Sequence, residues 1–445
     1  MTPGRTKVNV QLAVRNGRGL SELPGLHETN LRRDVGLKIE QIGSEYYFVL
    51  IGCDLNLQDD WTAKHDISPF GVFSLVQDCR ATWMHKVVNF AEEVLSPRGM
   101  RRAFPFKDDW DHASRDDAWL RQICAPLAVA GAKLFHSLFR SGADPRMDRL
   151  AAKLRELSRT RELIITITSN DFFIPWGLLY THPDESDDLA VDGSNFRWEG
   201  FWGYRHIIEH NPEYSTLPWD LKPSADGRLV TSFNIDDRID AQLNVACIQP
   251  QRTFFQSLLG WGIIERTKKS EFIGAIASDD FADQIVYFCC HGVGSGDPGR
   301  VSAALAQLTL SDDDPITATD IDYHMSGHEF HSHPIVFINA CQNGQMTTLF
   351  YQTVAKMLLK KGASGLIGAQ IDMPAVFAAE FAQRFFSGFF SRRGKNRILI
   401  GPLLRSTTRE LLQEHKNPLG LAYSLYRGMD CFIAWGDTRE PPSPS

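Results

Sequence analysis

The sequence predicts an α/β fold in which helices flank a mostly parallel sheet. Two observations carry this prediction: short apolar runs alternate with segments of helical periodicity, and two of those runs end in a reactive residue followed closely by glycine. Strands that are separated by helices need crossover connections, which favour parallel pairing with helices on both faces. Residues 1–154 follow the alternation less regularly, and we expect an N-terminal α+β region there.

The chain has 445 residues, too many for one ordinary hydrophobic core, so two or three packed units are expected. We divide it into the N-terminal region 1–154, a second domain 155–437 and a disordered Pro/Ser tail 438–445. The N-terminal region is either a degenerate half of the fold or a regulatory or recruitment domain. The sequence leaves both open.

Charge, hydropathy and cysteine content exclude several classes of protein. Lys and Arg total 47 against 54 for Asp and Glu, without the positive excess that binding to nucleic acid requires. No run approaches about 18 apolar residues and the N-terminus lacks a signal-peptide pattern, so we expect a cytoplasmic protein without membrane contact. The eight cysteines are scattered without paired spacing, which predicts no structural disulfides.

The N-terminal region shows one clear strand, at residues 46–57, and helical patterns at 80–95 and 116–140. Between the two helical patterns lies the charged stretch 98–117 (RGMRRAFPFKDDWDHASRDD). A solvated surface loop is the ordinary interpretation of such a stretch, and a docking site is the alternative.

From residue 150 onward, predicted helices and strands alternate regularly. A short hairpin or edge element is expected at 308–321, before a histidine-rich connection. Strands are predicted at 162–169, 228–235, 284–292, 334–344 and 429–435, and helices at 270–277, 374–390 and 402–414.

Two predicted strands deliver groups that can perform covalent chemistry. His291 ends the strand YFCCHG, and Cys341 ends the strand INACQNG. Function gathers beyond the carboxyl ends of strands in open α/β sheets, so both residues point to one crevice if their strands are neighbours. A histidine about 3 Å from a thiol promotes the thiolate and protonates a leaving amine. The backbone amides of Gly292 and Cys341 are the candidate oxyanion hole.

Each of these residues alone has a more ordinary interpretation, because a cysteine at the end of a buried strand is usually a small core residue and His-Gly is common. The paired strand-end placement, with His preceding Cys, favours the catalytic interpretation.

A metal site is the alternative suggested by His324, His328, His331 and His333 in the segment HMSGHEFHSH. The adjacent Cys289 and Cys290 could add ligands, but they face opposite sides of a strand and the spacing fits no zinc pattern. We therefore expect no metal and no cofactor, with the histidines on a mobile loop beside the active site. The segment 292–299 (GVGSGDPG) lacks the Lys-Ser/Thr of a phosphate loop and is predicted to be a flexible active-site loop.

Over residues 155–436 the sequence resembles the caspase-like CHAT domains, relatives of caspases and separase. The motifs are FFIPWGLLY, VYFCCHG, LTLSDDDPITATDI, VFINACQNG and GASGLIGAQIDMPAVFAAEFAQRFF, followed by a Tyr-rich closing helix before the last strand. The resemblance implies a caspase-haemoglobinase sheet and a cysteine endopeptidase with His291 and Cys341 as its dyad. Their separation of 50 residues matches the caspase spacing. Gly177 departs from the family, which usually has an acidic residue after Pro-Trp.

The resemblance also implies a role: regulated cleavage of a specific protein in bacterial, including antiviral, defence or in programmed cell death, with an activating or sensor protein as partner. A catalytically silent interaction scaffold and a zinc-binding module are the alternatives. Retention of both His291 and Cys341 argues against the scaffold.

In caspase-like folds, the segment after the strand that follows the catalytic one helps to build the pocket for the residue before the scissile bond. Here this segment is GLIGAQIDMP, with Asp372 as its acidic residue. A carboxylate in a partly dry pocket favours Arg or Lys. Asp372 would otherwise cap a helix starting at Pro374. Asn339 and Gln370 complete the predicted substrate-binding residues.

Overall fold

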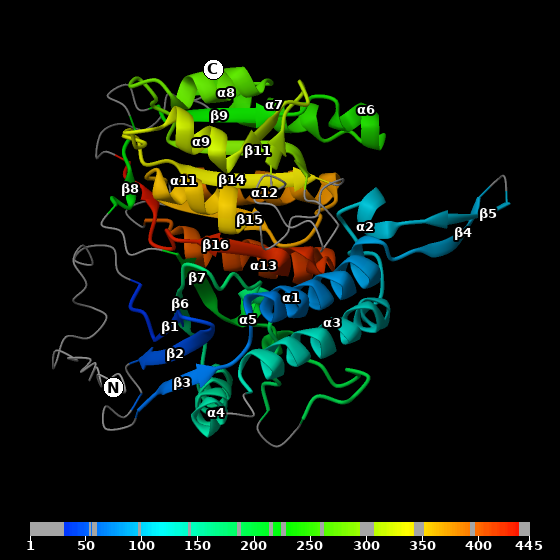
Figure 1. The fold of residues 1–445 in the computed structure, drawn as a ribbon. Coiled ribbons are helices and arrows are strands. Elements are labelled where there is room, and N and C mark those ends of the chain that lie inside the picture. The colour runs from blue at the N-terminus through cyan, green and yellow to red at the C-terminus, as the bar shows by residue number, and fades with distance from the viewer. Residues whose placement is uncertain are drawn as a thin grey trace, which may run out of the picture.

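The structure is a computed structural model, and it shows one large sheet crossing the whole molecule (Figure 1). The described residues are 31–52, 55, 60–96, 99–140, 144–184, 188–212, 217–223, 228–258, 262–293, 307–341, 351–391 and 397–435. The predicted tail 438–445 lies outside them.

The strand order of the sheet is β10-β9-β11-β14-β15-β16-β7-β6-β1-β2-β3, with β12 paired to β11 and β13 to β12. Seven of the ten contacts along this order are parallel, which confirms the predicted α/β class. The strands are β1 Val35–Ile42, β2 Glu45–Gly52, β3 Thr62–His65, β6 Ile164–Thr168, β7 Ile207–Asn211, β9 Val230–Ile235, β10 Gly262–Arg266, β11 Ile285–Val293, β12 Gln307–Thr309, β13 Pro315–Thr317, β14 Ile335–Cys341, β15 Gly365–Ala369 and β16 Tyr423–Tyr426.

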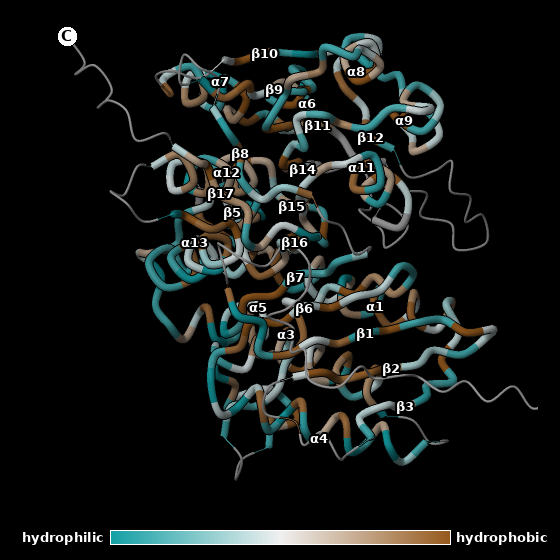
Figure 2. Tube along the Cα trace, turned by 90° about the vertical axis from the view of Figure 1, so that its left-hand side faces the viewer, coloured by the Kyte–Doolittle hydropathy of each residue, from teal (hydrophilic) through white to brown (hydrophobic). Residues whose placement is uncertain are grey.

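Helices cover both faces of the sheet, so the central strands are buried on both sides. Tyr287 and Cys289 of β11 belong to one hydrophobic cluster, and Phe288 and Cys290 to another on the opposite face. This two-sided burial explains why these strands are almost continuously apolar, and Figure 2 shows hydrophobic residues along the central strands. The helices are α1 Pro69–Trp83, α2 Pro105–Asp108, α3 Asp117–Leu138, α4 Pro145–Thr160, α5 Trp202–Arg205, α6 Ile239–Leu243, α7 Ile248–Ser257, α8 Lys269–Ile276, α9 Ala318–His324, α11 Lys356–Lys360, α12 Ala375–Phe390 and α13 Ile400–His415.

Strands from both sides of the expected boundary at residue 154 belong to the same sheet. β1 pairs with β6 in parallel, and β7 meets β16 through the single register pair His210 and Tyr426. The N-terminal region therefore packs as part of the sheet that carries the second domain.

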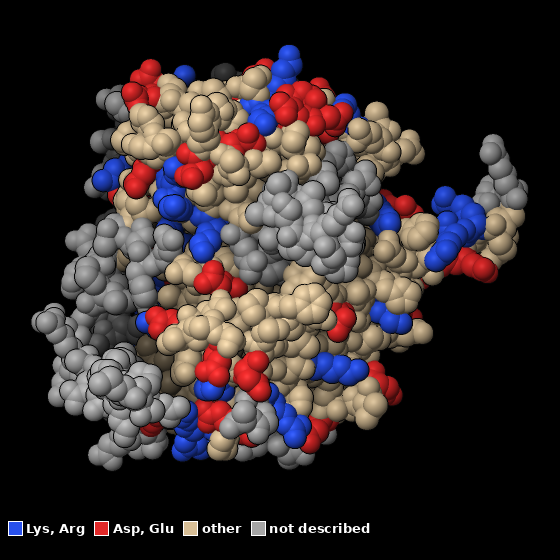
Figure 3. Space-filling model, in the orientation of Figure 1, with Lys and Arg blue, Asp and Glu red and all other residues tan. Residues whose placement is uncertain are grey.

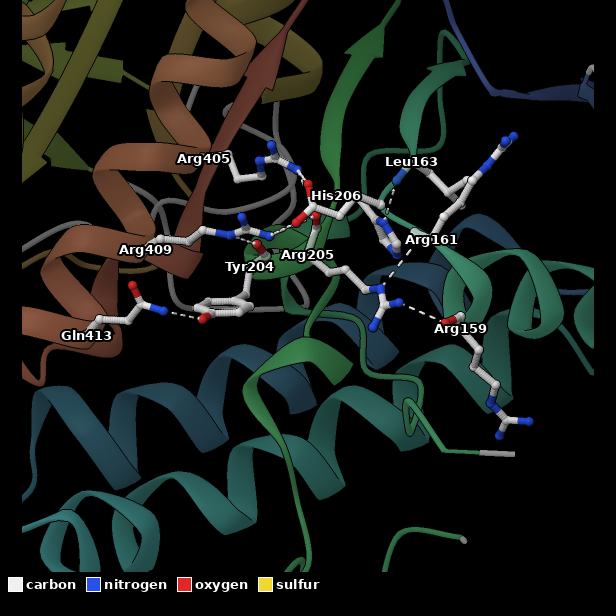
Figure 4. Close-up of polar contacts among 10 residues, drawn as sticks. Arg159, Arg161, Leu163, Tyr204, Arg205, His206, Arg405, Arg409 and Gln413 are labelled. Atoms are coloured by element: carbon white, nitrogen blue, oxygen red, sulfur yellow. Dashed lines mark hydrogen bonds and ion pairs between the residues drawn. The ribbon is translucent and has the colours of Figure 1, made fainter. Parts of the chain in front are cut away.

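Glu162, just before β6, adds a polar link between this strand and α13, both within residues 155–437. Its carboxylate accepts hydrogen bonds from Arg405 and Arg409 of α13, each at 2.6 Å. Arg409 also donates to the carbonyl oxygen of Tyr204 at 2.7 Å, and Figure 4 shows both arginines reaching toward the segment that contains Tyr204 and Arg205. Because Glu162 is 51% exposed, each ion pair contributes about 1 kcal/mol at most.

Three elements differ from the sequence prediction. The helical pattern 80–95 is helical only as far as Val88, and residues 92–96 form a strand, β4. The predicted Tyr-rich closing helix is strand β16, which lies between β15 and β7 and has a buried tyrosine at each end. The predicted last strand, 429–435, contributes only β17, Phe432–Ile433, which pairs with β8, Asp220–Leu221, outside the main sheet.

Two buried histidines near the junction make the stability of the fold depend on pH. The Nδ1 atom of His206 accepts the Leu163 N–H at 3.1 Å, and burial lowers the pKa of His206 to about 3. His210 lies 4.7 Å from the Phe173 ring, and burial lowers its pKa to about 4. Both imidazoles are therefore neutral in the folded protein at pH 5, whereas in the unfolded chain both bind protons below about pH 6.5.

We expect the free energy of unfolding to fall between pH 7 and pH 5 by about 2 kcal/mol for each histidine, because the unfolded state takes up the extra protons. Urea unfolding at both pH values measures this loss. His206→Asn keeps an acceptor for the Leu163 N–H and should reduce this loss by about 2 kcal/mol. His328→Gln is the control, since His328 is 49% exposed. An equal pH dependence in wild type and His206→Asn would contradict the assignment.

Candidate active site

His291 and Cys341 are register partners at the carboxyl ends of two adjacent strands. β11 and β14 pair in parallel from Ile285 opposite Ile335 to His291 opposite Cys341. The adjacency of these two strands was a prediction from sequence order, and the ladder confirms it. The side chains of both residues, and the predicted loop from residue 294 onward, lie outside the described residues.

The backbone at His291 has a neighbour on its other side as well. β9 pairs with β11 only as far as Cys289, and beyond that point β12 pairs with His291 through Thr309. Gly292, a candidate for the oxyanion hole, is the register partner of Leu308. His291 is therefore flanked within the sheet by Cys341 and Thr309.

Asp236, directly after β9, lies beside the candidate site and was not among the residues that the sequence singled out. Its side chain is fully buried, its N–H donates to the Cys289 carbonyl oxygen at 2.9 Å, and its carboxylate accepts two hydrogen bonds from Arg238, at 2.8 and 2.7 Å. Arg238 also binds Asp313 in the β12–β13 turn at 2.5 Å. The available signal was its position, because Asp236 follows a buried strand just as His291 and Cys341 end theirs.

Asn339, predicted to bind substrate, is committed to internal contacts. It is fully buried two residues before Cys341. Its amide nitrogen donates to the Ala378 carbonyl oxygen at 2.7 Å and to the Tyr287 hydroxyl at 3.0 Å, and its oxygen accepts from the Tyr423 hydroxyl at 2.6 Å. These bonds join β14 to α12 and β16, so Asn339 supports the strand that carries Cys341 rather than reaching a substrate.

Gln370 is likewise buried, just beyond the end of β15. Its amide oxygen accepts from Arg80 of α1 at 2.9 Å, and its amide nitrogen donates to the Tyr426 hydroxyl at 2.8 Å. Burial raises the pKa of Tyr426, so the hydroxyl stays protonated. Gln370 thus connects the N-terminal region to the carboxyl edge of the sheet from within the core.

Asp372 lies in the same segment but is only partly buried, between the buried residues Ile371 and Met373. Helix α12 begins at Ala375, and its N-cap residue is Pro374 rather than Asp372. Of the three predicted substrate-binding residues, Asp372 is therefore the one whose burial leaves it accessible at the carboxyl edge.

The zinc alternative finds no support in the described part of the chain. Cys289 and Cys290 lie in different hydrophobic clusters, as their adjacency predicts, and the His333 ring contacts the Gly362 carbonyl oxygen at 3.1 Å. Among described residues, the group close enough to share a metal is Glu410, Glu414 and His415, which includes none of the four histidines of HMSGHEFHSH. The cysteines whose side chains are described, Cys79, Cys124, Cys247, Cys289, Cys290 and Cys431, are free and buried.

Residues 265–418 match the sequence model of the CHAT domain. Over these residues the chain is similar to a CHAT domain. The match contains β11 and β14, and therefore His291 and Cys341, so the resemblance stated from sequence is confirmed. Within the described residues, no helix is long and apolar enough to cross a membrane.

The chain spans about 30% of the length of the known proteins to which it is similar. A probable protease of Vitiosangium sp. (strain GDMCC 1.1324) is 28% identical over 244 aligned residues, which cover 50% of this chain and 29% of that protein. Two crystal structures of the Saccharomyces cerevisiae separase–securin complex have TM-scores of 0.42 and 0.40, with 9% sequence identity. They cover 89% and 88% of this chain and 30% of the matched chain.

Proposed function

We propose that this protein is a cysteine endopeptidase that cleaves a specific protein substrate with the dyad His291 and Cys341. The observation that carries the proposal is the register pairing of these two residues at the carboxyl ends of adjacent parallel strands inside the CHAT domain. Residues from distant parts of a chain that converge at this edge of an α/β sheet are in the position where such folds bind ligands.

The proposed reaction divides peptide hydrolysis into two steps. His291 takes the Cys341 thiol proton, the thiolate attacks the substrate carbonyl carbon, and the amides of Gly292 and Cys341 stabilise the oxyanion. The intermediate collapses when His291 gives the proton to the leaving amine, which leaves a thioester on Cys341. Water, deprotonated by His291, then hydrolyses the thioester, and the proton returns to Cys341.

Asp236 has a supporting place in this proposal. Asp236 directly follows Ile235, which is the register partner of Cys289 in β11, and its carboxylate is buried. Arg238 compensates that buried charge, since burying a carboxylate without a partner is costly. The ion pair between Asp236 and Arg238 therefore keeps the segment beside β11 charged and ordered.

The biological setting proposed is regulated cleavage in bacterial, including antiviral, defence or programmed cell death, in the cytoplasm, with an activating or sensor protein as partner. It is supported by the CHAT domain and by the protease relative. The direct test is to incubate the protein with the proteins encoded beside its gene and to identify new N-termini by mass spectrometry. Cleavage that disappears in Cys341→Ala supports the proposal, and binding to those proteins without any cleavage would favour a catalytically silent scaffold.

Asp372 is proposed to set the preference for the residue before the scissile bond. We expect the wild type to prefer Arg or Lys at that position. Asp372→Asn should lower kcat/KM for an Arg substrate about 10- to 100-fold, because hydrogen bonds between charged groups contribute about 1.5 to 3 kcal/mol. Peptides with Arg, Lys, Leu, Asp or Met before the bond measure the profile. Asp279→Asn is the control, since Asp279 is 82% exposed. Preference for Asp or Leu in the wild type, or an unchanged profile in Asp372→Asn, would exclude this role.

A further inference from the structure

A two-stranded ribbon projects from the body of the molecule (Figure 1). It consists of β4, Glu92–Ser96, and β5, Gly99–Ala103, which pair in an antiparallel register along their whole length. It includes the start of the charged stretch 98–117, for which the sequence left a solvated loop and a docking site open. The structure has a regular ribbon at the start of this stretch instead of a loop, and the ribbon takes no part in the proposed catalytic reaction.

The base of the ribbon is firmly anchored. Glu92 accepts a hydrogen bond from the Trp119 indole at 2.5 Å and from Arg115 at 2.6 Å. Trp119 stacks on Phe106 at 5.5 Å and meets Phe90 edge-on at 6.1 Å. This aromatic cluster joins the residues before β4, after β5 and in α3, so the direction in which the ribbon leaves the body is fixed by the core.

The outer part of the ribbon, in contrast, is apolar and exposed. Leu95 and Met100 are cross-strand partners, with exposed fractions of 82% and 62%. β4 and β5 form a two-stranded sheet of their own, so each has an outer edge outside that pairing. A two-stranded ribbon is only marginally stable in water, and a strand edge with adjacent apolar side chains is a ready template for another strand. A protein segment that pairs with the ribbon would cover both the strand edge and the apolar side chains of Leu95 and Met100.

The ribbon lies on the catalytic side of the molecule. Arg80, near the end of α1, binds Gln370 beyond the carboxyl end of β15, and β4 begins twelve residues later in the chain, at Glu92. Figure 1 shows the ribbon projecting on the side to which the carboxyl ends of the central strands point. A protein held by the ribbon is therefore held beside the edge that carries His291 and Cys341.

The charge of the ribbon indicates which sequence it fits. Arg101 and Arg102 of β5 are both exposed. The Arg102 guanidinium and the Lys107 ammonium each lie over the Phe104 ring, at 5.2 and 5.3 Å from its centroid. Figure 3 shows Lys and Arg on the ribbon, with Asp and Glu beside them. On β4, Glu92 is engaged at the base by Arg115, and the exposed Glu93 is the register partner of Arg102. Arg101 has the apolar Val94 as its register partner, so its positive charge favours an acidic partner.

We propose that the β4–β5 ribbon is a docking site for the protein substrate, which adds an extended acidic segment with an apolar side chain to the edge of β5. Backbone hydrogen bonds to the strand edge would provide affinity, Leu95 and Met100 an apolar contact, and Arg101 and Arg102 the preference for acidic residues. The inference rests on the proposed peptidase function and deepens it, because it separates recognition of the whole substrate from recognition of the scissile bond.

The test compares full-length variants on two substrates: the cleaved protein, and a short peptide that spans only its scissile bond. Leu95→Ser with Met100→Ser, and separately Arg101→Glu with Arg102→Glu, should each lower kcat/KM on the protein at least 10-fold and leave peptide cleavage unchanged. Val191→Ser is the matched control, because Val191 is an apolar residue with an exposed fraction of 97% outside the ribbon. Binding of the protein substrate to Cys341→Ala should weaken by the same factor in the ribbon variants.

The outcomes separate the two proposals. Unchanged cleavage of both substrates by the ribbon variants would overturn the docking site and leave the peptidase function intact. A wild type that cleaves neither substrate would overturn the peptidase function, and the docking proposal with it. Conversion of a dimer to a monomer by the ribbon substitutions would identify a second copy of this chain as the occupant and would also overturn substrate docking.

Discussion

Cys341→Ala and His291→Ala are each expected to abolish proteolysis while leaving the fold intact. A dyad works as a unit, so the loss of either member should lower kcat by about 10³-fold or more, which brings cleavage below detection in most assays. The sheet around them is held by the apolar residues of β11 and β14 and by Asn339, so the melting temperature should change little. Circular dichroism measures the fold, and cleavage of the protein substrate measures activity.

Thiol labelling tests the same dyad without a known substrate. Burial raises the pKa of Cys79 to about 12 and also raises the pKa values of Cys124, Cys290 and Cys431, so these thiols should react slowly with iodoacetamide at pH 7. In a Cys53→Ser background, Cys341 should be alkylated first, and His291→Ala should slow its alkylation. Wild-type rates of cleavage in Cys341→Ala, or an alkylation rate of Cys341 that does not depend on His291, would show that the dyad is misassigned.

Gly177→Ala is expected to destabilise the fold severely. A Cβ atom on Gly177 would lie 2.9 Å from the Leu421 carbonyl oxygen and 3.4 Å from the Gly203 Cα, and both neighbours are backbone atoms that cannot rotate away. Overpacking of this kind costs about 3 kcal/mol, and a side chain as long as Glu should prevent folding. The close approach also explains why this chain has glycine where CHAT domains usually have an acidic residue.

Gly274→Ala is the matched control for this prediction, measured by urea unfolding. Gly274 lies within α8, and a Cβ atom there would have no other atom within 4 Å. Alanine is the better helix former, so this substitution should stabilise the protein by about 1 kcal/mol. Equal stabilities of the two alanine variants would refute the packing argument at Gly177.

The central strands could be predicted because burial on both faces gives them an unmistakable composition. The runs that end at His291 and Cys341 are apolar at nearly every position, and parallel order follows from the helices between them. The proposed dyad could be predicted from the sequence for the same reason, because His291 and Cys341 lie at the ends of these two apolar runs. The resemblance to CHAT domains then implied cysteine-peptidase chemistry for the two residues at these strand ends.

Other parts depended on contacts that no local pattern reveals. Residues 92–96 have helical propensity as well as strand propensity, and they became a strand because β5 pairs with them. Asn339 and Gln370 appeared available for substrate, but Tyr423 and Arg80, distant in sequence, already bind their amides. No sequence motif marks Asp236, which is distinguished by its burial beside β11.

The continuous sheet has a consequence for how this protein can be divided. A cut at residue 154 would remove β1, the partner of β6, and would expose Ile165 and Ile167 along a newly opened strand edge. The same cut would take away Arg80, which binds Gln370 beside the catalytic edge. The first 154 residues are thus part of the same folded unit as the edge that carries His291 and Cys341, and a cut there would not leave an intact sheet.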